Sequence, residues 1–267
     1  MRITSWNILH GQPLAQPTST FATALTSLGS DLIACQEVDH HLDRSERCNQ
    51  SRDIANSISA PFWGFAPAIA GTPGVSWRKL KGSEKLVISN KDHDEITSEE
   101  GFYGISIASK APVKNWLRLE LGRSLIGLPL AVANSAGKPR LLYVKDEPRV
   151  ALAAVLENGW TAINTHLSFV PLVNIYQLLR LSRWAKKIEV EHSTKVLLVG
   201  DFNLPWGLPT KVTRWVRATN ALSYPSWKPA ISFDYILTRK ENLGQLTEFL
   251  HGPIEFSDHR AISVDIP

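Results

Sequence analysis

The chain has 267 residues, 43% of them apolar, with a formal net charge of +4 and an isoelectric point of about 9.1. This length and apolar content can bury a substantial core, so we expect residues 1–267 to form a single domain. The longest weakly polar stretch, 124–133, is interrupted by Gly127 and Pro129 and is too short to span a bilayer, so we expect no transmembrane segment. No secretory leader precedes the first strand pattern, and we expect a cytoplasmic, monomeric protein. The mild positive charge favours polyanionic substrates without requiring them.

Strand-like and helical patterns alternate along the chain, which is typical of an α/β domain. In chain order the predicted elements are the strand Arg2–Trp6, a helix over 21–28 ended by Gly29, the strand Asp31–Gln36, a short helix over 54–58, the strands Tyr103–Ala108, Leu141–Val144, Val150–Leu156 and Thr161–Asn164, a long helix over 172–188, and the strands Lys195–Val199, Phe233–Leu237 and Ile262–Ile266.

Three other stretches carry weaker signals. Residues 61–100 are rich in Gly, Pro and charge, which predicts an elaborated loop region. Residues 134–138 predict a turn between two strands. Lys211, Arg214 and Arg217 recur at helical spacing, which predicts a basic helix.

Polar side chains stand at the points where several predicted strands begin or end. Asn7 and Glu37 end the first two strands, Asp201 and Asn203 follow a later apolar run, and Asp258 precedes the last strand. Carboxylate and amide oxygens are ligands that Mg²⁺ prefers. We expect Glu37 to be the principal ligand of Mg²⁺ or Mn²⁺, with Asn7 and Asp258 completing the shell. Asp201 and Asn203 share a face on extended backbone, which suits a carboxylate that activates water beside an amide that holds a phosphate oxygen.

Two histidines and an arginine lie in similar positions. His259 can donate to a phosphoryl oxygen if a carboxylate holds its other ring nitrogen, and Asp234, at the start of a strand, is the expected partner. His166 ends a strand and is a second imidazole that would face phosphate. Arg149 opens a strand, where its guanidinium can contact phosphate in a bidentate manner.

Each of these residues also has an ordinary structural explanation. A strand-end Asn is usually a turn residue, and an Asp-x-Asn sequence usually caps a loop. A His before an apolar residue usually lies satisfied in a core. The functional interpretation is favoured only by the order and spacing of all these residues taken together.

In that order the motifs resemble those of the endonuclease/exonuclease/phosphatase superfamily, and the resemblance covers nearly the whole chain. A set of motifs in the right order is far more specific than any one of them. The matching segments are Trp6-Asn7-Ile8 with His10-Gly11, Gln36-Glu37-Val38, Asp43-Arg44, Asn164-Thr165-His166-Leu167, Gly200-Asp201-Phe202-Asn203, Phe233-Asp234-Tyr235-Ile236 and Ser257-Asp258-His259.

The resemblance implies a DNase-I-like fold, a four-layer α/β/β/α sandwich of two mixed sheets flanked by helices. It also implies a Mg²⁺- or Mn²⁺-dependent phosphoester hydrolase with its site at one edge of the sheets. By motif position, Glu37 carries over as the metal ligand with Asn7 and Asp258 nearby, Asp201 and Asn203 as the residues that activate water and contact phosphate, Asp234 and His259 as the paired carboxylate and imidazole, and His166 and Arg149 as phosphate contacts.

The sequence departs from the family pattern in one strand. The segment from Tyr103 to Lys110 resembles the family's central strand, which often carries an Asn where Ile105 stands. In relatives a polar side chain near this place can steady the first histidine. If Ile105 occupies that place, His166 lacks this support.

Several tryptophans lie where a substrate could reach them. Trp206 comes just after Asp201 and could stack on a base, although a core Trp beneath a basic helix is the more ordinary explanation. Trp227 lies on a loop before Asp234 and could contact substrate or plug the sheet. Trp77 lies in the most basic loop, which could follow a nucleic-acid backbone or touch a membrane surface, although such loops are usually only solvated.

Three functions fit these observations. The first is a nuclease or nucleotide phosphodiesterase that hydrolyses DNA or RNA. The second is a phosphatase or phospholipase-type phosphodiesterase that acts on a small or lipid phosphate, as inositol phosphatases and sphingomyelinases do. The third is a catalytically silent interaction module, which would have no need for the complete set of polar residues.

Overall fold

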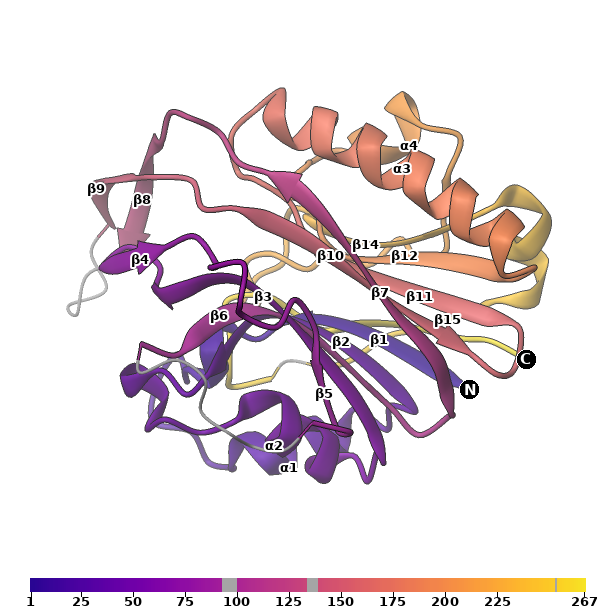
Figure 1. The fold of residues 1–267 in the computed structure, drawn as a ribbon, viewed down its shortest axis with the longest axis horizontal. Helices are drawn as coiled ribbons and strands as arrows, with labels where there is room; N and C mark the ends of the chain where they lie inside the picture. The colour runs from indigo at the N-terminus through magenta and orange to yellow at the C-terminus, as the bar shows by residue number, and fades with distance from the viewer. Residues whose placement is uncertain (93–99, 134–138, 253) are drawn as a thin grey trace.

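In the computed structural model, which describes all residues except 93–99, 134–138 and 253, the chain forms two β-sheets packed face to face. Helices cover both outer faces, and the chain termini lie together at one end of the sandwich (Figure 1). This is the four-layer arrangement that the sequence predicts. The helices are α1 (Phe21–Ser27) and α2 (Gln50–Ser57) over the first sheet, and α3 (Val173–Glu191) and α4 (Leu208–Val212) over the second.

The first sheet brings the two ends of the chain together. Its strand order is β15–β16–β1–β2–β6–β3–β4, and β5 pairs with β3. β1 lies parallel to β2 and antiparallel to β16. The strands are β1 (Arg2–Asn7), β2 (Leu32–His40), β3 (Phe62–Thr72), β4 (Ser76–Arg78), β5 (Ile88–Ser89), β6 (Phe102–Ser109), β15 (Thr247–Phe249) and β16 (Ile262–Asp265).

The second sheet has the order β13–β14–β12–β11–β10–β7, and a separate hairpin joins β8 to β9. β11 and β12 are parallel because α3 carries the chain back between them. The strands are β7 (Val113–Gly122), β8 (Leu128–Ala133), β9 (Pro139–Val144), β10 (Arg149–Leu156), β11 (Trp160–His166), β12 (Lys195–Asp201), β13 (Val216–Arg217) and β14 (Asp234–Thr238).

The main hydrophobic cores lie between adjacent layers, because alternate side chains of each strand point to opposite faces of its sheet. Along β2, Ile33 and Cys35 pack with the apolar residues of α1 and α2. Leu32 and Ala34, on the other face of β2, pack with residues of β10 and β12. A further core lies between the second sheet and α3. Burial on both faces of β2 holds this strand rigidly. The strand extends beyond the predicted end at Gln36 to His40, so Glu37 lies within it.

The prediction of an irregular region over 61–100 is wrong for its first part, because β3 is a long central strand. The sequence obscures it with residues that disfavour strands. Pro67 lies at a shift in the pairing of β3 with β6, where a missing N–H does little harm. Gly64 leaves room for the Trp116 ring of the other sheet, whose nearest atom would lie 2.7 Å from a Cβ at this position.

The predicted basic helix is also wrong. α4 ends at Val212, and Arg217 belongs to β13, where it pairs with Leu237 of β14. Trp215 is buried against α3, to which its indole N–H donates a hydrogen bond at Ser182 Oγ, 2.8 Å away. The predicted turn at 134–138 lies outside the described residues, between β8 and β9.

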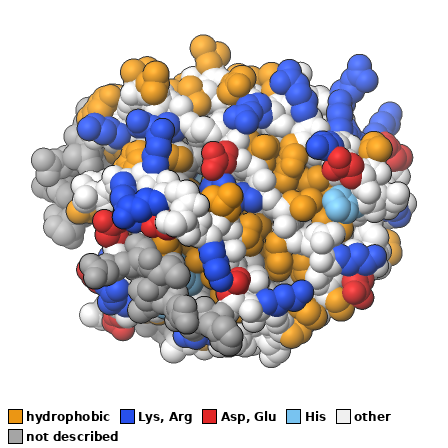
Figure 2. Space-filling view, in the orientation of Figure 1, with side chains coloured by type: hydrophobic (Ala, Val, Ile, Leu, Met, Phe, Trp, Pro, Cys, Tyr) orange, Lys and Arg blue, Asp and Glu red, His pale blue; other side chains and the backbone are white. Residues whose placement is uncertain are grey.

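In the described part of the chain, no helix is both long enough and apolar enough to cross a membrane. The basic residues do not form one continuous band on the face shown in Figure 2. Lys and Arg side chains are spread over this face, with Asp and Glu side chains between them.

Candidate active site at the strand ends

The two sheets bring the predicted polar residues to one end of the sandwich. Asn7 of β1 lies opposite Gln36 of the parallel strand β2. In the second sheet, Asp201 of β12 lies between His166 of the parallel strand β11 and Asp234 of β14. The site is therefore formed where strand ends of both sheets meet.

A β-bulge in β2 sets the position of Glu37. The pairing with β6 shifts between Cys35 and Val38, so two residues of β2 face the single residue Ile105. Glu37 itself has φ of 57°, a left-handed conformation that is costly for a residue other than Gly. Such a bulge turns a side chain away from the regular alternation of the strand.

Asn7 joins the two carboxylates at the centre of the site. Its Nδ2 donates to Glu37 Oε1 and to Asp201 Oδ2, both at 3.1 Å, and its Oδ1 accepts from the Leu9 N–H at 3.1 Å. The side chain is only 1% exposed. This single amide therefore fixes the distance between a side chain of the first sheet and one of the second.

Asp201 is held from several sides. Gly200 precedes it with φ of 139°, and a Cβ there would lie 1.9 Å from Thr165 O, so only glycine allows β11 and β12 to approach this closely. Asp201 Oδ1 accepts the Asn203 N–H at 2.9 Å. Asn203 has φ of 50° and donates from Nδ2 to Leu167 O at 3.1 Å, which leaves its second amide N–H for another partner.

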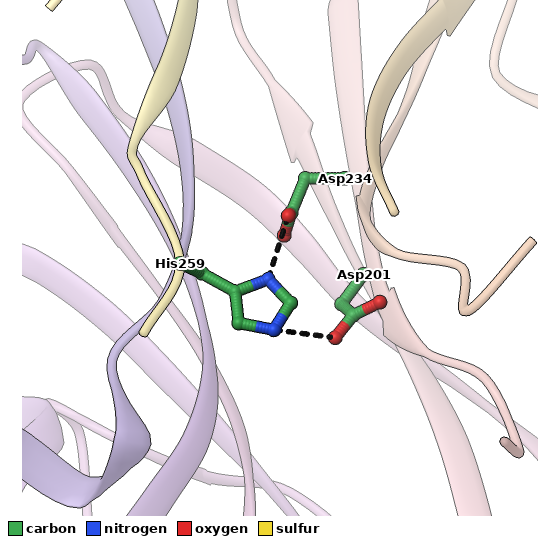
Figure 3. A group of neighbouring side chains, drawn as sticks. All are labelled: Asp201, Asp234 and His259. Carbon is green, nitrogen blue, oxygen red and sulfur yellow. Dashed lines mark hydrogen bonds and ion pairs between the residues drawn. The ribbon is translucent and has the colours of Figure 1, made fainter. Parts of the chain in front are cut away.

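His259 lies between two carboxylates (Figure 3). Its Nδ1 is 2.7 Å from Asp234 Oδ2, and its Nε2 is 3.7 Å from Asp201 Oδ2. The expected contact between His259 and Asp234 is thus present. Asp234 is almost fully buried, and its other oxygen, Oδ1, has no partner among the described residues.

Burial and the charges of neighbouring residues shift the pKa of His259, and that of Asp201, in opposite directions. Burial alone would lower the pKa of His259, but the carboxylates of Asp234 and Asp201 outweigh it and raise that pKa to about 10. Burial raises the pKa of Asp201 to about 6, although the charge of His259 opposes this. At neutral pH the histidine is therefore a cation, and Asp201 is mostly ionised.

His166 and Arg149 lie on the other side of Asp201. His166 Nε2 is 3.6 Å from Asp201 Oδ2, while burial, then Arg149, then His259 hold the pKa of His166 well below its usual range. Arg149 is 4% exposed, and its Nη2 contacts Glu147 Oε1 at 2.8 Å and Asp146 Oδ1 at 3.3 Å. His166 is thus a neutral imidazole beside a guanidinium that already has acidic partners.

Ile105, the residue that departs from the family pattern, lies close to His166. It is buried between the sheets and lines a small cavity together with His166, Arg149 and Tyr103. Its apolar side chain can give the His166 ring no hydrogen bond.

The acidic group around Glu37 has the character of a cation site. Burial first, and then the charges of Asp258 and Asp201, raise the pKa of Glu37 to about 7. A divalent cation would relieve this repulsion between buried carboxylates. Asp201, Asp234 and His259 also offer ligand atoms within 4.8 Å of one another. We favour the carboxylates around Glu37 as the cation site, because His259 Nδ1 already forms a hydrogen bond with Asp234.

Three buried polar residues that support the site were quoted in motifs without a role. Gln36 Nε2 donates to Asn164 Oδ1 at 2.7 Å, and Asn164 Nδ2 donates to Cys35 O and Ser106 O, both at 2.8 Å. Ser257 Oγ donates to Asn7 O at 2.6 Å and accepts the His259 N–H at 3.1 Å. Their position in the sequence, within two residues of a predicted site residue, could have identified them.

The aromatic candidates differ in exposure. Trp206 and Trp227 are 76% and 65% exposed, and the neighbour of Trp227, Ser226, donates its N–H to Asp258 O at 2.7 Å. Trp77 instead packs against a small buried cluster. The ring of Tyr224, which sequence reasoning missed and no motif contains, lies 5.0 Å from that of His259.

Comparison with known proteins concerns the family and the fold of the chain. A model of the endonuclease/exonuclease/phosphatase family matches residues 4–259. No curated protein sequence matches the chain.

Solved structures of the same fold cover the whole chain at low identity. A mannosyl-6-phosphatase from Bacteroides thetaiotaomicron is 10% identical, with a TM-score of 0.57, and 100% of this chain aligns with 99% of that one. The human Nocturnin catalytic domain with bound sulfate is 16% identical, with a TM-score of 0.58 and coverage of 100% and 93%. Beta toxin from Staphylococcus aureus is 14% identical, with a TM-score of 0.55 and coverage of 100% and 99%. At these identities the likeness shows the fold alone.

Proposed function

Because the chain belongs to the endonuclease/exonuclease/phosphatase family, whose members hydrolyse phosphoesters, we propose that it is a divalent-metal-dependent phosphodiesterase. The observation that carries this proposal is the arrangement around Asp201. Its carboxylate lies between the Asp234–His259 pair and the amide that leads to Glu37. This arrangement places a possible proton donor, His259, and a possible proton acceptor, Asp201, beside a candidate cation site at Glu37.

Glu37 is the proposed principal metal ligand, with Asp258 and Asn7 beside it. Bound Mg²⁺ or Mn²⁺ would supply charge neutralisation and a more acidic water. The raised pKa of Glu37 supports this role, because it reports acidic groups crowded in a buried place. Asn7 donates from its amide nitrogen to the carboxylates of Glu37 and Asp201. It would therefore assist metal binding by orienting Glu37, or it would bind the metal through its amide oxygen after the amide rotates.

Asp201 is the proposed acceptor of the proton from the attacking water. Its Oδ2 lies 3.6 Å from His166 Nε2 and 3.7 Å from His259 Nε2, and the backbone N–H of Asn203 fixes its other oxygen. A carboxyl group with a pKa near 6 is ionised at neutral pH and still basic enough to accept a proton. Asn203 then has an amide N–H to offer to a phosphate oxygen.

His259 is the proposed donor to the phosphoryl group. Asp234 accepts the hydrogen bond at Nδ1, so the proton on Nε2 points towards Asp201 and the space between the sheets. Such a donor acts most strongly as charge develops on the phosphoryl oxygens. His166 and Arg149 are proposed to contact the same oxygens from the opposite side.

A phosphodiester suits this charge balance better than a monoester. The positive charge of Arg149 is already offset by Glu147 and Asp146, so the site has little excess positive charge for a phosphate dianion. The exposed Trp206 and Trp227 rings also favour a substrate with flat bases, which supports a nuclease or nucleotide phosphodiesterase. A phosphatase acting on a small phosphate is the second candidate.

All the proposed site residues come from one chain, so a monomer would suffice, and two free cysteines suit a cytoplasmic location. Sedimentation and cell fractionation test these two points.

The activity test is a hydrolysis screen with Mg²⁺, Mn²⁺ or EDTA. Its substrates are bis-p-nitrophenyl phosphate, p-nitrophenyl phosphate, plasmid and single-stranded DNA, RNA, inositol phosphates and sphingomyelin. We expect metal-dependent cleavage of diesters that is lost in Glu37→Gln, while Glu157→Gln, a substitution at an exposed carboxylate in the turn between β10 and β11, retains the cleavage. Equal turnover in Glu37→Gln and the parent would reject the metal assignment.

A further inference from the structure

A cavity of about 390 Å³ lies beside the candidate active site, between β10, the end of β7 and the segment that follows β4. Its size is that of a small-ligand site. Figure 1 shows β4 at the end of the molecule opposite the chain termini. The charged residues that line it are Lys79, Arg118, Arg123 and Arg149 against a single acid, Glu120.

Two of these arginines are buried with hydrogen-bonding capacity unused. The side chains of Arg118 and Arg149 are 8% and 4% exposed, and the Nε atom of each is buried without a partner among the described residues. Arg118 donates from Nη2 to Pro67 O at 3.1 Å and contacts Glu120 Oε1 at 3.0 Å, but that carboxylate is 73% exposed and so is a weak partner. A buried guanidinium N–H without an acceptor is unfavourable unless a ligand supplies one.

The other two cations are available to a ligand. Arg123 lies with its guanidinium 5.4 Å from the centre of the Trp77 ring and donates only a long bond, 3.4 Å, to Asp146 O. Lys79 is exposed, and its amine has no ion pair within the described residues. The neighbouring Arg78, in contrast, is paired with Glu84 and Glu100.

The cavity continues towards the reacting groups. Arg149, Pro148, Val150 and Ala68 line both this cavity and the small one that reaches His166. His166 Nε2 in turn is 3.6 Å from Asp201 Oδ2. An anion held by Arg123 and Arg118 would therefore lie on the far side of Arg149 from the scissile phosphoester.

We propose that this cavity binds a second phosphate of the substrate, so that the enzyme acts on phosphoesters that carry a further phosphate group. This rests on the function proposed above and narrows its substrate class. Arg149 is offset by acids, whereas Lys79, Arg118 and Arg123 together exceed the charge of Glu120, so the anion is attracted to the far end of the cavity. Arginine forks also match the geometry of phosphate oxygens.

A binding experiment tests the cavity without relying on catalysis. Inorganic pyrophosphate is titrated calorimetrically into the parent, Arg123→Gln, Lys79→Gln and the control Lys114→Gln, all in EDTA. Lys114 is exposed on the same strand as Arg118 and does not line the cavity. We expect the Kd to rise about tenfold in each cavity variant, as for loss of one charge-assisted hydrogen bond, and to stay unchanged in Lys114→Gln. Equal Kd values in all four proteins, or no binding, would overturn the proposal.

A kinetic experiment distinguishes the source of the second phosphate. One arm compares a thymidine dinucleotide with and without a 5′-phosphate, and the other compares a hexose bisphosphate with its monophosphate. In the pair that matches the true substrate, we expect Arg123→Gln to raise the KM of the member with the additional phosphate about tenfold more than the KM of the member without it. The same KM ratio in parent and variant for both pairs would refute the subsite while leaving phosphoester hydrolysis intact. Pyrophosphate binding that depends on Arg123, in a protein that hydrolyses no phosphoester, would support the subsite and reject the proposed function.

Discussion

Replacement of Asn164 by Ala should destabilise the protein severely, because this side chain joins the two sheets beneath the site. Asn164 Nδ2 donates to Cys35 O and Ser106 O, and its Oδ1 accepts from Gln36 Nε2, all in fully buried surroundings. An unsatisfied buried polar group costs about 1–3 kcal/mol. Two carbonyls lose a partner, whereas Gln36 Nε2 keeps Ser5 Oγ and Ala34 O as acceptors, so the free energy of unfolding should fall by about 2–6 kcal/mol.

Urea denaturation of Asn164→Ala and of the control Asn115→Ala measures this effect. Asn115 is exposed on β7, and its replacement should change the free energy of unfolding by less than about 0.5 kcal/mol. Gln36 directly precedes Glu37, so any Asn164→Ala protein that folds should also bind Mg²⁺ more weakly. A loss of stability below about 1 kcal/mol would show that water or a rearranged Gln36 satisfies the network, and the reasoning would fail.

Three further predictions concern single residues. His259→Gln should lower kcat about 10²–10⁴-fold with little change in KM, because its contact strengthens as charge develops; a variant with raised KM and unchanged kcat would contradict this. Gly200→Ala should lower the free energy of unfolding by about 1–3 kcal/mol in urea, whereas Gly244→Ala, with no atom near its Cβ, should be neutral. Burial, then the charge of His41, lower the pKa of His40 to about 4. Between about pH 4 and 6.5 the unfolded chain therefore binds more protons at His40 than the folded protein does. The free energy of unfolding should then fall as the pH falls through this window. Between pH 7 and 5 that loss should be about 2 kcal/mol smaller in His40→Phe, and equal slopes of stability against pH would refute the assignment.

The candidate site could be predicted from the sequence because its chemistry is local to the strand ends. Apolar runs mark the strands, and the polar residues beside these runs lie at or near strand ends. The contact between His259 and Asp234 followed from that placement alone, although they are 25 positions apart. Glu37 is the exception, because it lies inside β2, where a bulge redirects its side chain. The roles of these residues in catalysis remain proposals.

Elements whose structure depends on distant contacts were missed. β3 contains Gly64 and Pro67, and it is a strand because Trp116 fills the space above the glycine and β6 accommodates the proline. The segment around Arg217 has helical spacing, yet pairing with β14 makes it extended. No local pattern contains the information for these two segments. β7 was also missed, although Leu117-Arg118-Leu119-Glu120-Leu121 alternates as a half-buried strand does, so its local signal was overlooked.

Backbone strain connects the fold to the proposed chemistry. Glu37, Asn203 and Ser257 have φ of 57°, 50° and 64°, and each lies within two residues of a carboxylate of the site or carries one. Left-handed residues other than Gly cost about 1–3 kcal/mol and persist only where surrounding contacts impose them. Here the contacts are the bulge opposite Ile105, the N–H of Asn203 on Asp201, and the two hydrogen bonds of the Ser257 hydroxyl. Other left-handed residues, such as Glu46, Ser59 and Ser193, lie in turns away from the site. At Glu37, Asn203 and Ser257, by contrast, the left-handed backbone is best explained by the need to aim the neighbouring carboxylates at one point between the sheets.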